Sequence, residues 1–142
     1  MIMKKILLGI LLAFLSIFSQ GFTIKKISPN DIIGIYWSPK KDAKIEIFLK
    51  DQHYFGKFVW AVKPRKDAKN PNKALQKRDI LGLEFLTKFV YNEGVYNGGE
   101  IYDPETGKTY SCKMSLDGSK LKVRGYLGIS LFGRTEYFER VK

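Results

Sequence analysis

The amino-acid sequence predicts an all-β protein, a single antiparallel meander that closes into a barrel of about eight strands. Two tight turns, residues 103–107 (DPETG) and 117–119 (DGS), support this class. In the first turn, the Asp side chain accepts a hydrogen bond from the backbone, Pro presets φ and Gly takes the left-handed position. In the second turn, Asp-Gly is a signal for a two-residue hairpin. Between the turns, polar and apolar residues alternate from Thr109 to Leu116, the period of a strand with one buried face.

The remaining strands follow from the same alternation and from short turns between them. The predicted strands cover residues 32–36, 44–50, 53–62, 81–91, 95–102, 109–116, 120–126 and 134–141. Alternation assigns one face of the third strand to Tyr54, Gly56, Phe58, Trp60 and Val62, and one face of the fourth to Leu83, Phe85, Phe89 and Tyr91. One helical turn is expected at residues 74–77. A β-sandwich is the main alternative architecture.

The N-terminal segment has the pattern of a secretory signal. Lys4 and Lys5 precede an apolar run from Ile6 to Phe18, whose 13 residues are fewer than the roughly 20 that span a bilayer as a helix. The pattern predicts a signal peptide over residues 1–21, and therefore a periplasmic or secreted protein. Residues 22–142 then have the size of a single β-barrel domain. An uncleaved anchor is the alternative.

The chain is strongly basic, with a formal net charge of +11 at pH 7. Removing residues 1–21 takes away Lys4 and Lys5 and no acidic residue, which leaves +9. Such a charge favours anionic partners such as lipid head groups, surface polysaccharide or nucleic acid. Export argues against nucleic acid, so no nucleic-acid partner is expected. A basic composition without any specific partner is the alternative, because the Lys residues are spread along the chain.

Basic residues are nevertheless frequent in the long connection from Lys63 to Asp79, which also contains Pro64 and Pro71. A connection of this length in a small β domain is either functional or mobile. Each cation near an anionic lipid surface contributes about 1 kcal/mol to binding. The residues expected to contact such a surface are Arg65, Lys66, Lys69, Lys73 and Arg78. The alternative is a solvated loop.

Three motifs together resemble a known family: residues 98–110 (GGEIYDPETGKTY), 121–126 (LKVRGY) and 133–135 (GRT). Residues 70–71, 81–83 and 56–60 give weaker support. From about Ile33 to Lys142 the chain resembles the bacterial family called domain of unknown function 2147. The resemblance implies small secreted proteins with a lipocalin-like barrel and no assigned activity.

The first strand departs from the family pattern. Many members have Gly-x-Trp there, whereas this chain has Gly34-Ile35-Tyr36 and then Trp37. In lipocalin-like barrels an Arg from the last strand covers the first-strand aromatic residue. The resemblance therefore implies that Arg134 or Arg140 stacks on Tyr36 or Trp37 by a cation–π contact.

The sequence offers little to support catalysis, and a non-enzymatic protein is predicted. Cys112 lies on the apolar side of its strand and is expected to be a small buried hydrophobe, and His53 is the only histidine. No His or Cys cluster has metal-ligand spacing, so neither a metal nor a cofactor is expected. Carboxylates for glycosidase chemistry exist in predicted strands, at Glu84, Glu100, Glu136 and Glu139, without a pairing that the sequence fixes.

The function favoured by the sequence is binding of a small apolar or amphiphilic molecule. Residues 22–142 contain eighteen aromatic residues, more than the turns require. Binding pockets for small molecules are mostly apolar with a few placed polar groups. The predicted lining residues are Tyr54, Phe58, Trp60, Phe85, Phe89, Tyr110 and Tyr126. Two alternatives stay open: the rings fill the barrel as core, or the protein acts at the cell envelope through its basic loop.

Overall fold

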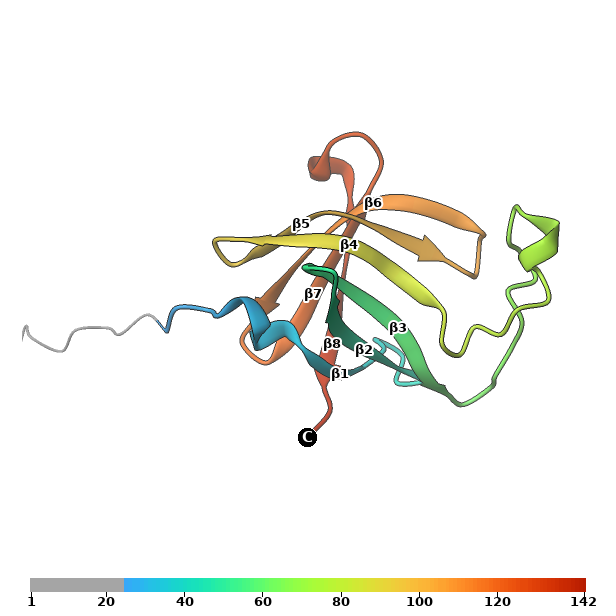
Figure 1. The fold of residues 1–142 in the computed structure, drawn as a ribbon, viewed down its shortest axis with the longest axis horizontal. Helices are drawn as coiled ribbons and strands as arrows, with labels where there is room; N and C mark the ends of the chain where they lie inside the picture. The colour runs from blue at the N-terminus through green and yellow to red at the C-terminus, as the bar shows by residue number, and fades with distance from the viewer. Residues whose placement is uncertain (1–24) are drawn as a thin grey trace, which may run out of the picture.

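Residues 25–142 are described by the computed structural model, and they form a closed barrel of eight antiparallel strands (Figure 1). The strands are β1 (Gly34–Trp37), β2 (Ala43–Lys50), β3 (His53–Ala61), β4 (Glu84–Asn92), β5 (Val95–Asp103), β6 (Lys108–Asp117), β7 (Lys120–Tyr126) and β8 (Arg134–Arg140). Each strand pairs with the next, and β8 pairs with β1. The predicted all-β meander barrel is confirmed. The predicted signal peptide lies outside the described residues.

Three short 3-10 helices accompany the strands: η1 (Pro29–Ile32), η2 (Lys73–Leu75) and η3 (Ser130–Phe132). The helical turn expected at residues 74–77 corresponds to η2, which begins one residue earlier. Asn72 caps η2, because its side chain accepts a hydrogen bond from the Ala74 amide at 3.0 Å. Among residues 25–142, no helix has the length and apolar character needed to cross a membrane.

The two turns that define the fold class have the expected chemistry. The Asp103 carboxylate accepts from the Glu105 amide at 2.9 Å and from the Thr106 hydroxyl at 2.8 Å, and Gly107 has a φ of 74°. Gly118, with a φ of 59°, follows the last residue of β6. Both positive φ values are conformations that glycine adopts without the steric cost of a Cβ atom.

A β-bulge in β3 corrects the predicted facing of Trp60. Lys44 pairs with Trp60 while Ile45 pairs with Phe58, so Val59 is an extra residue on β3. Each extra residue reverses the alternation beyond it. Trp60 therefore faces outwards beside Lys44 and is 41% exposed. The prediction that Trp60 shares the inner face of Phe58 is wrong.

Two irregularities in β4 change its inner face. Tyr54 pairs with Phe89 and Gly56 with Leu86, which leaves an extra residue in β4 where Lys88 has a φ of 62°. Leu86 is consequently buried, although alternation from Phe89 assigned it to the outside. A second register shift lies between Glu84 and Leu86, and Phe85, the extra residue there, is buried as well.

The seam between β1 and β8 is short and depends on Arg140. Only Tyr36 with Arg140 and Trp37 with Glu139 are in register across it. The Arg140 guanidinium lies 4.7 Å from the centre of the Tyr36 ring and donates to the Tyr36 hydroxyl at 2.5 Å. It also donates to two backbone carbonyl oxygens, of Asp31 at 2.5 Å and Ile33 at 3.0 Å. The expected stacking of a last-strand Arg on a first-strand aromatic residue is confirmed for this pair.

The middle of the barrel is filled by side chains. Phe89 is completely buried, and a Cβ atom added at Gly99 would lie 2.5 Å from its ring. The absence of a side chain at Gly99 therefore makes room for the Phe89 ring against the wall of the barrel. Met114 and Cys112, on the inner face of β6, complete this layer and are 1% and 0% exposed.

Candidate functional site

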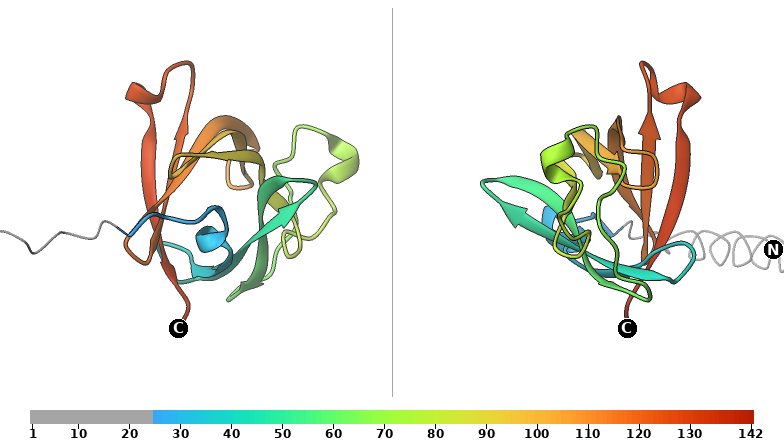
Figure 2. Two further views of the ribbon diagram at one scale, coloured as in Figure 1. Left: turned by 60° about the vertical axis from the view of Figure 1, so that its left-hand side comes forward. Right: turned by 90° about the vertical axis from the view of Figure 1, so that its right-hand side faces the viewer.

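One end of the barrel, here called the closed end, is covered by residues 27–32, which include η1 (Figure 2). Four tyrosine hydroxyls from the barrel donate hydrogen bonds to this segment. One joins Tyr36 to the Ile32 carbonyl at 2.8 Å. The others join Tyr54 to Asn30 Oδ1 at 2.8 Å, Tyr91 to the Ile27 carbonyl at 2.7 Å, and Tyr96 to the Pro29 carbonyl at 2.7 Å. Ile32 is completely buried beneath them. The closed end is therefore apolar core capped by satisfied hydroxyls.

Burial keeps the phenols of Tyr36, Tyr54 and Tyr96 at the closed end neutral. Burial raises the pKa of Tyr36 to about 12, and the nearby Arg140 charge only partly opposes this. The pKa of Tyr96 is raised, chiefly by burial, and so is that of Tyr54. These hydroxyls act as hydrogen-bond donors at neutral pH. Tyr54 and Phe89, predicted to line a ligand site, thus lie in the packed core.

The opposite end of the barrel, here called the open end, carries a different set of inward-facing residues: Phe58, Phe85, Ile101, Tyr110 and Glu136. Their facing follows from strand register with buried partners. Phe58 lies opposite Ile45, Ile101 opposite Leu86 and Tyr110, and Glu136 opposite Val123. Phe85 stacks on Phe58 with ring centres 4.1 Å apart.

Except for Phe85, which is buried, the residues of the open end are only partly buried although they face inwards. Phe58, Ile101 and Tyr110 are half-buried, and the Glu136 side chain is 42% exposed. Solvent therefore reaches the inner face of the barrel at this end. The aromatic and aliphatic groups offer an apolar surface. Polar partners are present in the Tyr110 hydroxyl and in the ion pair between Glu136 and Arg134 at 3.0 Å.

The predicted lining residues thus divide into three groups. Phe58, Phe85 and Tyr110 lie together at the open end. Tyr54 and Phe89 belong to the core. Trp60 and Tyr126 face outwards, the latter because Tyr126 lies opposite the exposed Ser111 while neighbouring Gly125 lies opposite buried Cys112.

Sequence reasoning missed two residues of the open end. Ile101 was recognisable from its alternation with Glu100 and Tyr102. Glu136 was named only as a strand carboxylate, since its inward facing depends on its register with Val123 on β7. The outward facing of Tyr126 was signalled by the alternation of Leu121 and Val123, which continues to the glycine before it.

The basic connection between β3 and β4 is organised around Asp67, which is completely buried. Its carboxylate accepts from the Tyr102 hydroxyl at 2.6 Å, from the Asn70 amide at 2.8 Å and from the Arg78 guanidinium at 2.8 Å. Burial alone raises the pKa of Asp67, but these donors outweigh it, and the pKa lies below its usual value. Arg78 therefore holds this connection together.

The other four predicted anion contacts of this connection differ in whether they have an acidic partner. Two are ion-paired, Arg65 with Glu105 and Lys66 with Asp79, the latter at 2.6 Å. Lys69 and Lys73 are exposed, and neither forms an ion pair with any residue between 25 and 142. Of the five predicted anion contacts, these two have no acidic partner in the described part of the chain.

The side chains considered for catalysis are separated. Cys112 is completely buried, and burial raises the pKa of its thiol to about 12, so little thiolate exists at neutral pH. His53 is the first residue of β3, where its Nδ1 lies 2.8 Å from the carbonyl oxygen of Asp51. Within residues 25–142, no three His, Cys, Asp or Glu side chains gather in a way that could hold a metal ion.

The sequence matches, over residues 34–140, the family described as "Uncharacterized protein conserved in bacteria (DUF2147)". The chain belongs to this DUF2147 family. The match begins at Gly34 and ends at Arg140, so it contains all eight strands and the residues of the seam. Both ends of the barrel described above, apart from the N-terminal segment that covers the closed end, therefore lie within the part of the chain shared with the family.

A solved structure supports the same fold for this DUF2147 protein. The protein is described as "Protein HP1028 from the human pathogen Helicobacter pylori belongs to the lipocalin family". It superimposes with a TM-score of 0.71 at 24% sequence identity, covering 78% of this chain and 83% of the other. The barrel is therefore lipocalin-like. No curated protein matches the sequence.

Proposed function

We propose that this DUF2147 protein is an exported, non-enzymatic carrier whose open end binds a small apolar or amphiphilic molecule. The observation that carries the proposal is the partial exposure of inward-facing Phe58, Ile101 and Tyr110, because inner-face side chains of a filled barrel are buried. Lipocalin-like barrels of this strand number have room for a small ligand. The low thiolate content at Cys112 and the distribution of carboxylates favour binding over catalysis.

The composition of the open end favours an amphiphile over a purely apolar molecule. The apolar part of such a ligand would contact the stacked rings of Phe58 and Phe85. Its polar head group would contact the Tyr110 hydroxyl and the exposed ion pair of Glu136 and Arg134. A site of this kind uses the apolar surface for affinity and the few polar groups for orientation.

Contact of the basic connection with an anionic surface has less support as the main function. Arg65, Lys66 and Arg78 already have acidic partners, and Arg78 is committed to the buried Asp67. Lys69 and Lys73 alone would supply about 2 kcal/mol near an anionic membrane.

A fluorescence titration with cis-parinaric acid, an amphiphile with an apolar chain and a carboxylate, tests the open end. Phe58→Ala and Tyr110→Ala should each weaken binding by about tenfold, equivalent to about 1.4 kcal/mol of lost contact. Trp60→Ala and Tyr126→Ala are matched controls, since they remove outward-facing rings from the same strand and from the neighbouring strand. They should leave the affinity unchanged.

Equal losses in all four variants, or no binding by the unmodified protein, would reject the open-end site. Native mass spectrometry of protein isolated from the envelope fraction of its own host provides an independent check. A retained mass that is lost on denaturation identifies the class of natural ligand. The intact mass also tests export, because cleavage after Gly21 leaves a chain that begins at Phe22.

A further inference from the structure

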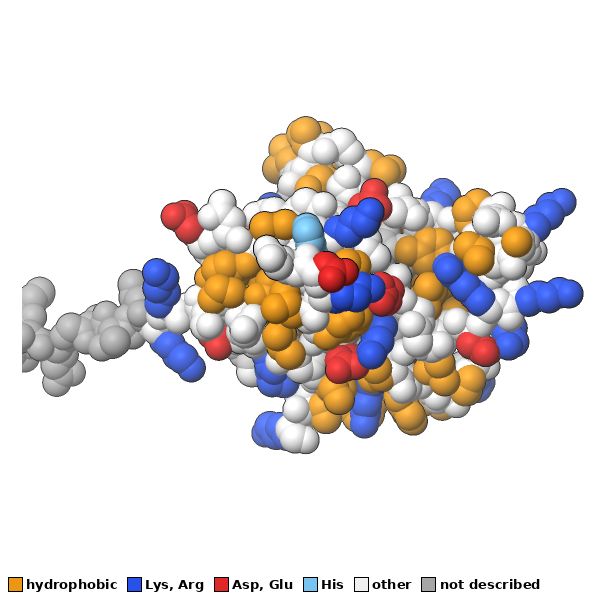
Figure 3. Space-filling model, viewed as in Figure 1, with side chains coloured by type: hydrophobic (Ala, Val, Ile, Leu, Met, Phe, Trp, Pro, Cys, Tyr) orange, Lys and Arg blue, Asp and Glu red, His pale blue; other side chains and the backbone are white. Residues whose placement is uncertain are grey.

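The connection between β7 and β8, here called the apolar loop (residues 127–133), exposes four large hydrophobic side chains. They are Leu127 at 70% exposure, Ile129 at 58%, Leu131 at 75% and Phe132 at 79%. The loop projects from the barrel, and apolar atoms gather on this projection at the top of Figure 3. Contiguous apolar surface of this kind marks a contact site for a membrane or another protein.

Arg124 holds the apolar loop in this projecting form. Its guanidinium donates to the carbonyl oxygens of Ser130 at 2.8 Å and Leu131 at 3.1 Å, and to the Thr135 hydroxyl at 2.7 Å. η3 lies within the loop and positions Leu131 and Phe132 on one short turn. The exposed side chains are therefore presented on a fixed backbone.

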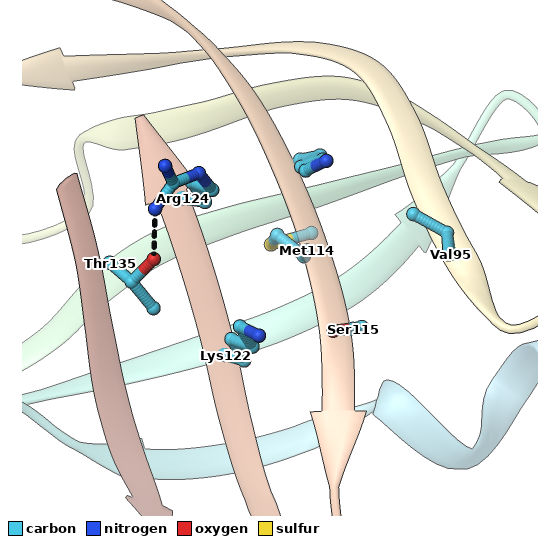
Figure 4. A pocket seen from close by; sticks show the side chains of 7 residues that line it. Val95, Met114, Ser115, Lys122, Arg124 and Thr135 are labelled. Carbon is cyan, nitrogen blue, oxygen red and sulfur yellow. Dashed lines mark hydrogen bonds between the residues drawn. The ribbon is translucent and has the colours of Figure 1, made fainter. Parts of the chain in front are cut away.

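Cations lie on the outer faces of β6 and β7, and β7 leads into the apolar loop. A groove of about 350 Å³ runs over the outer face of β6 to β8, and its lining includes Lys113, Lys122 and Arg124 (Figure 4). Lys113 lies opposite Arg124 in register, and Lys122 is two residues before Arg124 on β7. In the described part of the chain, none of the three forms an ion pair. Arg134, 86% exposed at its side chain, follows the loop directly.

Acidic residues lie at the borders of this surface. Glu100 is opposite Ser111 on β6, Glu139 is opposite Lys120 on β7, and Glu136 faces the barrel interior beside Val123. The groove itself has no carboxylate among its lining residues. Positive charge therefore lies along the strands that lead to the apolar projection.

We propose that the apolar loop inserts into an anionic lipid bilayer while Lys113 and Lys122 contact the head groups. Apolar side chains at the boundary of head groups and acyl chains, with cations at head-group level, are the two components of interfacial membrane binding. A projecting loop fits a deformable bilayer, whereas a protein partner needs a matching cavity. This assignment differs from the basic connection between β3 and β4, and it does not depend on ligand binding at the open end.

Flotation with lipid vesicles tests the proposal, using protein isolated from its host. Vesicles of phosphatidylethanolamine with about 30% phosphatidylglycerol should bind the protein, and phosphatidylcholine vesicles should bind it at least tenfold more weakly. Leu131→Ser with Phe132→Ser should reduce binding to the anionic vesicles at least tenfold. Lys113→Gln with Lys122→Gln should reduce it about tenfold, and added salt should abolish this difference.

Two control pairs make these comparisons specific. Val62→Ser with Val90→Ser removes exposed apolar residues elsewhere, and Lys69→Gln with Lys73→Gln removes cations from the basic connection. Both pairs should bind vesicles like the unmodified protein, and all variants should keep its unfolding midpoint. The proposal is overturned if the unmodified protein does not float with anionic vesicles, or if the control pairs lose binding equally. It is also overturned if the loop pair leaves flotation unchanged but dissociates a dimer in sedimentation, since the loop would then be a subunit interface.

Discussion

The two ends of the barrel use similar inward-facing residues for different purposes. At the closed end, Tyr54, Tyr91 and Tyr96 each donate a hydroxyl hydrogen bond to the N-terminal segment. At the open end, Phe58 and Tyr110 face the same interior but stay half-buried. Aromatic composition alone therefore does not separate core from binding site. The hydroxyl partners of these three closed-end tyrosines, and the burial of Tyr54 and Tyr96, do separate them.

The largest expected difference between the two ends concerns removal of a ring. Phe89→Ala should lower the free energy of unfolding by about 3–5 kcal/mol, because the ring is fully buried against Gly99 and leaves a cavity. Phe58→Ala should cost less than about 2 kcal/mol, since part of that ring is already in solvent. Urea unfolding measures both. A loss at Phe58 as large as that at Phe89 would mean that the open end is also packed core.

A smaller effect is expected from the charged group next to the closed end. Arg140→Met keeps most of the side-chain length but removes the donors to Tyr36, Ile33 and Asp31, and should cost about 2 kcal/mol. Arg134→Met, at the other end of β8, is the matched control and should cost less than about 0.5 kcal/mol because its side chain is exposed. Equal urea midpoints for the two variants would show that the seam does not rely on Arg140.

An effect confined to alkaline pH is expected from the Tyr36 phenol. Its pKa is raised from 10.0 to about 12 by burial, so its contribution to stability is complete below pH 10 and is lost as the pH rises towards 12. Tyr36→Phe should flatten the fall in stability between about pH 10 and about pH 12. Tyr137→Phe, at an exposed position, should leave that fall unchanged. If both curves match the unmodified protein, the Tyr36 phenol is not protected by folding.

The fold was predictable from local chemistry, because turn types and the alternation of strands depend on residues that are adjacent in the sequence. The segment from Asp103 to Gly107 and the glycine after Asp117 adopt the turns that their residue types predict. The pairing of β1 with β8 could be expected from the family resemblance. The contact between Arg140 and Tyr36 agrees with that expectation.

The candidate site was less predictable, because bulges are set by contacts between strands. Val59 and Lys88 carry no local signal of the extra residue that each strand contains, and Lys88 adopts a positive φ without being glycine. Each bulge reversed the facing of neighbouring residues, so Trp60 was assigned inwards and Leu86 outwards. Sequence alternation also gives no measure of how deeply an inward-facing ring is buried, which is what separates Phe58 from Phe89.

The seam also bears on the order in which the barrel assembles. Every other strand pair joins neighbours along the chain, whereas Tyr36 and Arg140 are separated by 104 residues. The entropy of closing so long a loop favours formation of the hairpins first and of the seam last. Until then, β1 and β8 each present a free strand edge that can pair with another chain. The few bonds made by Arg140 therefore decide when a folding intermediate stops being prone to aggregation.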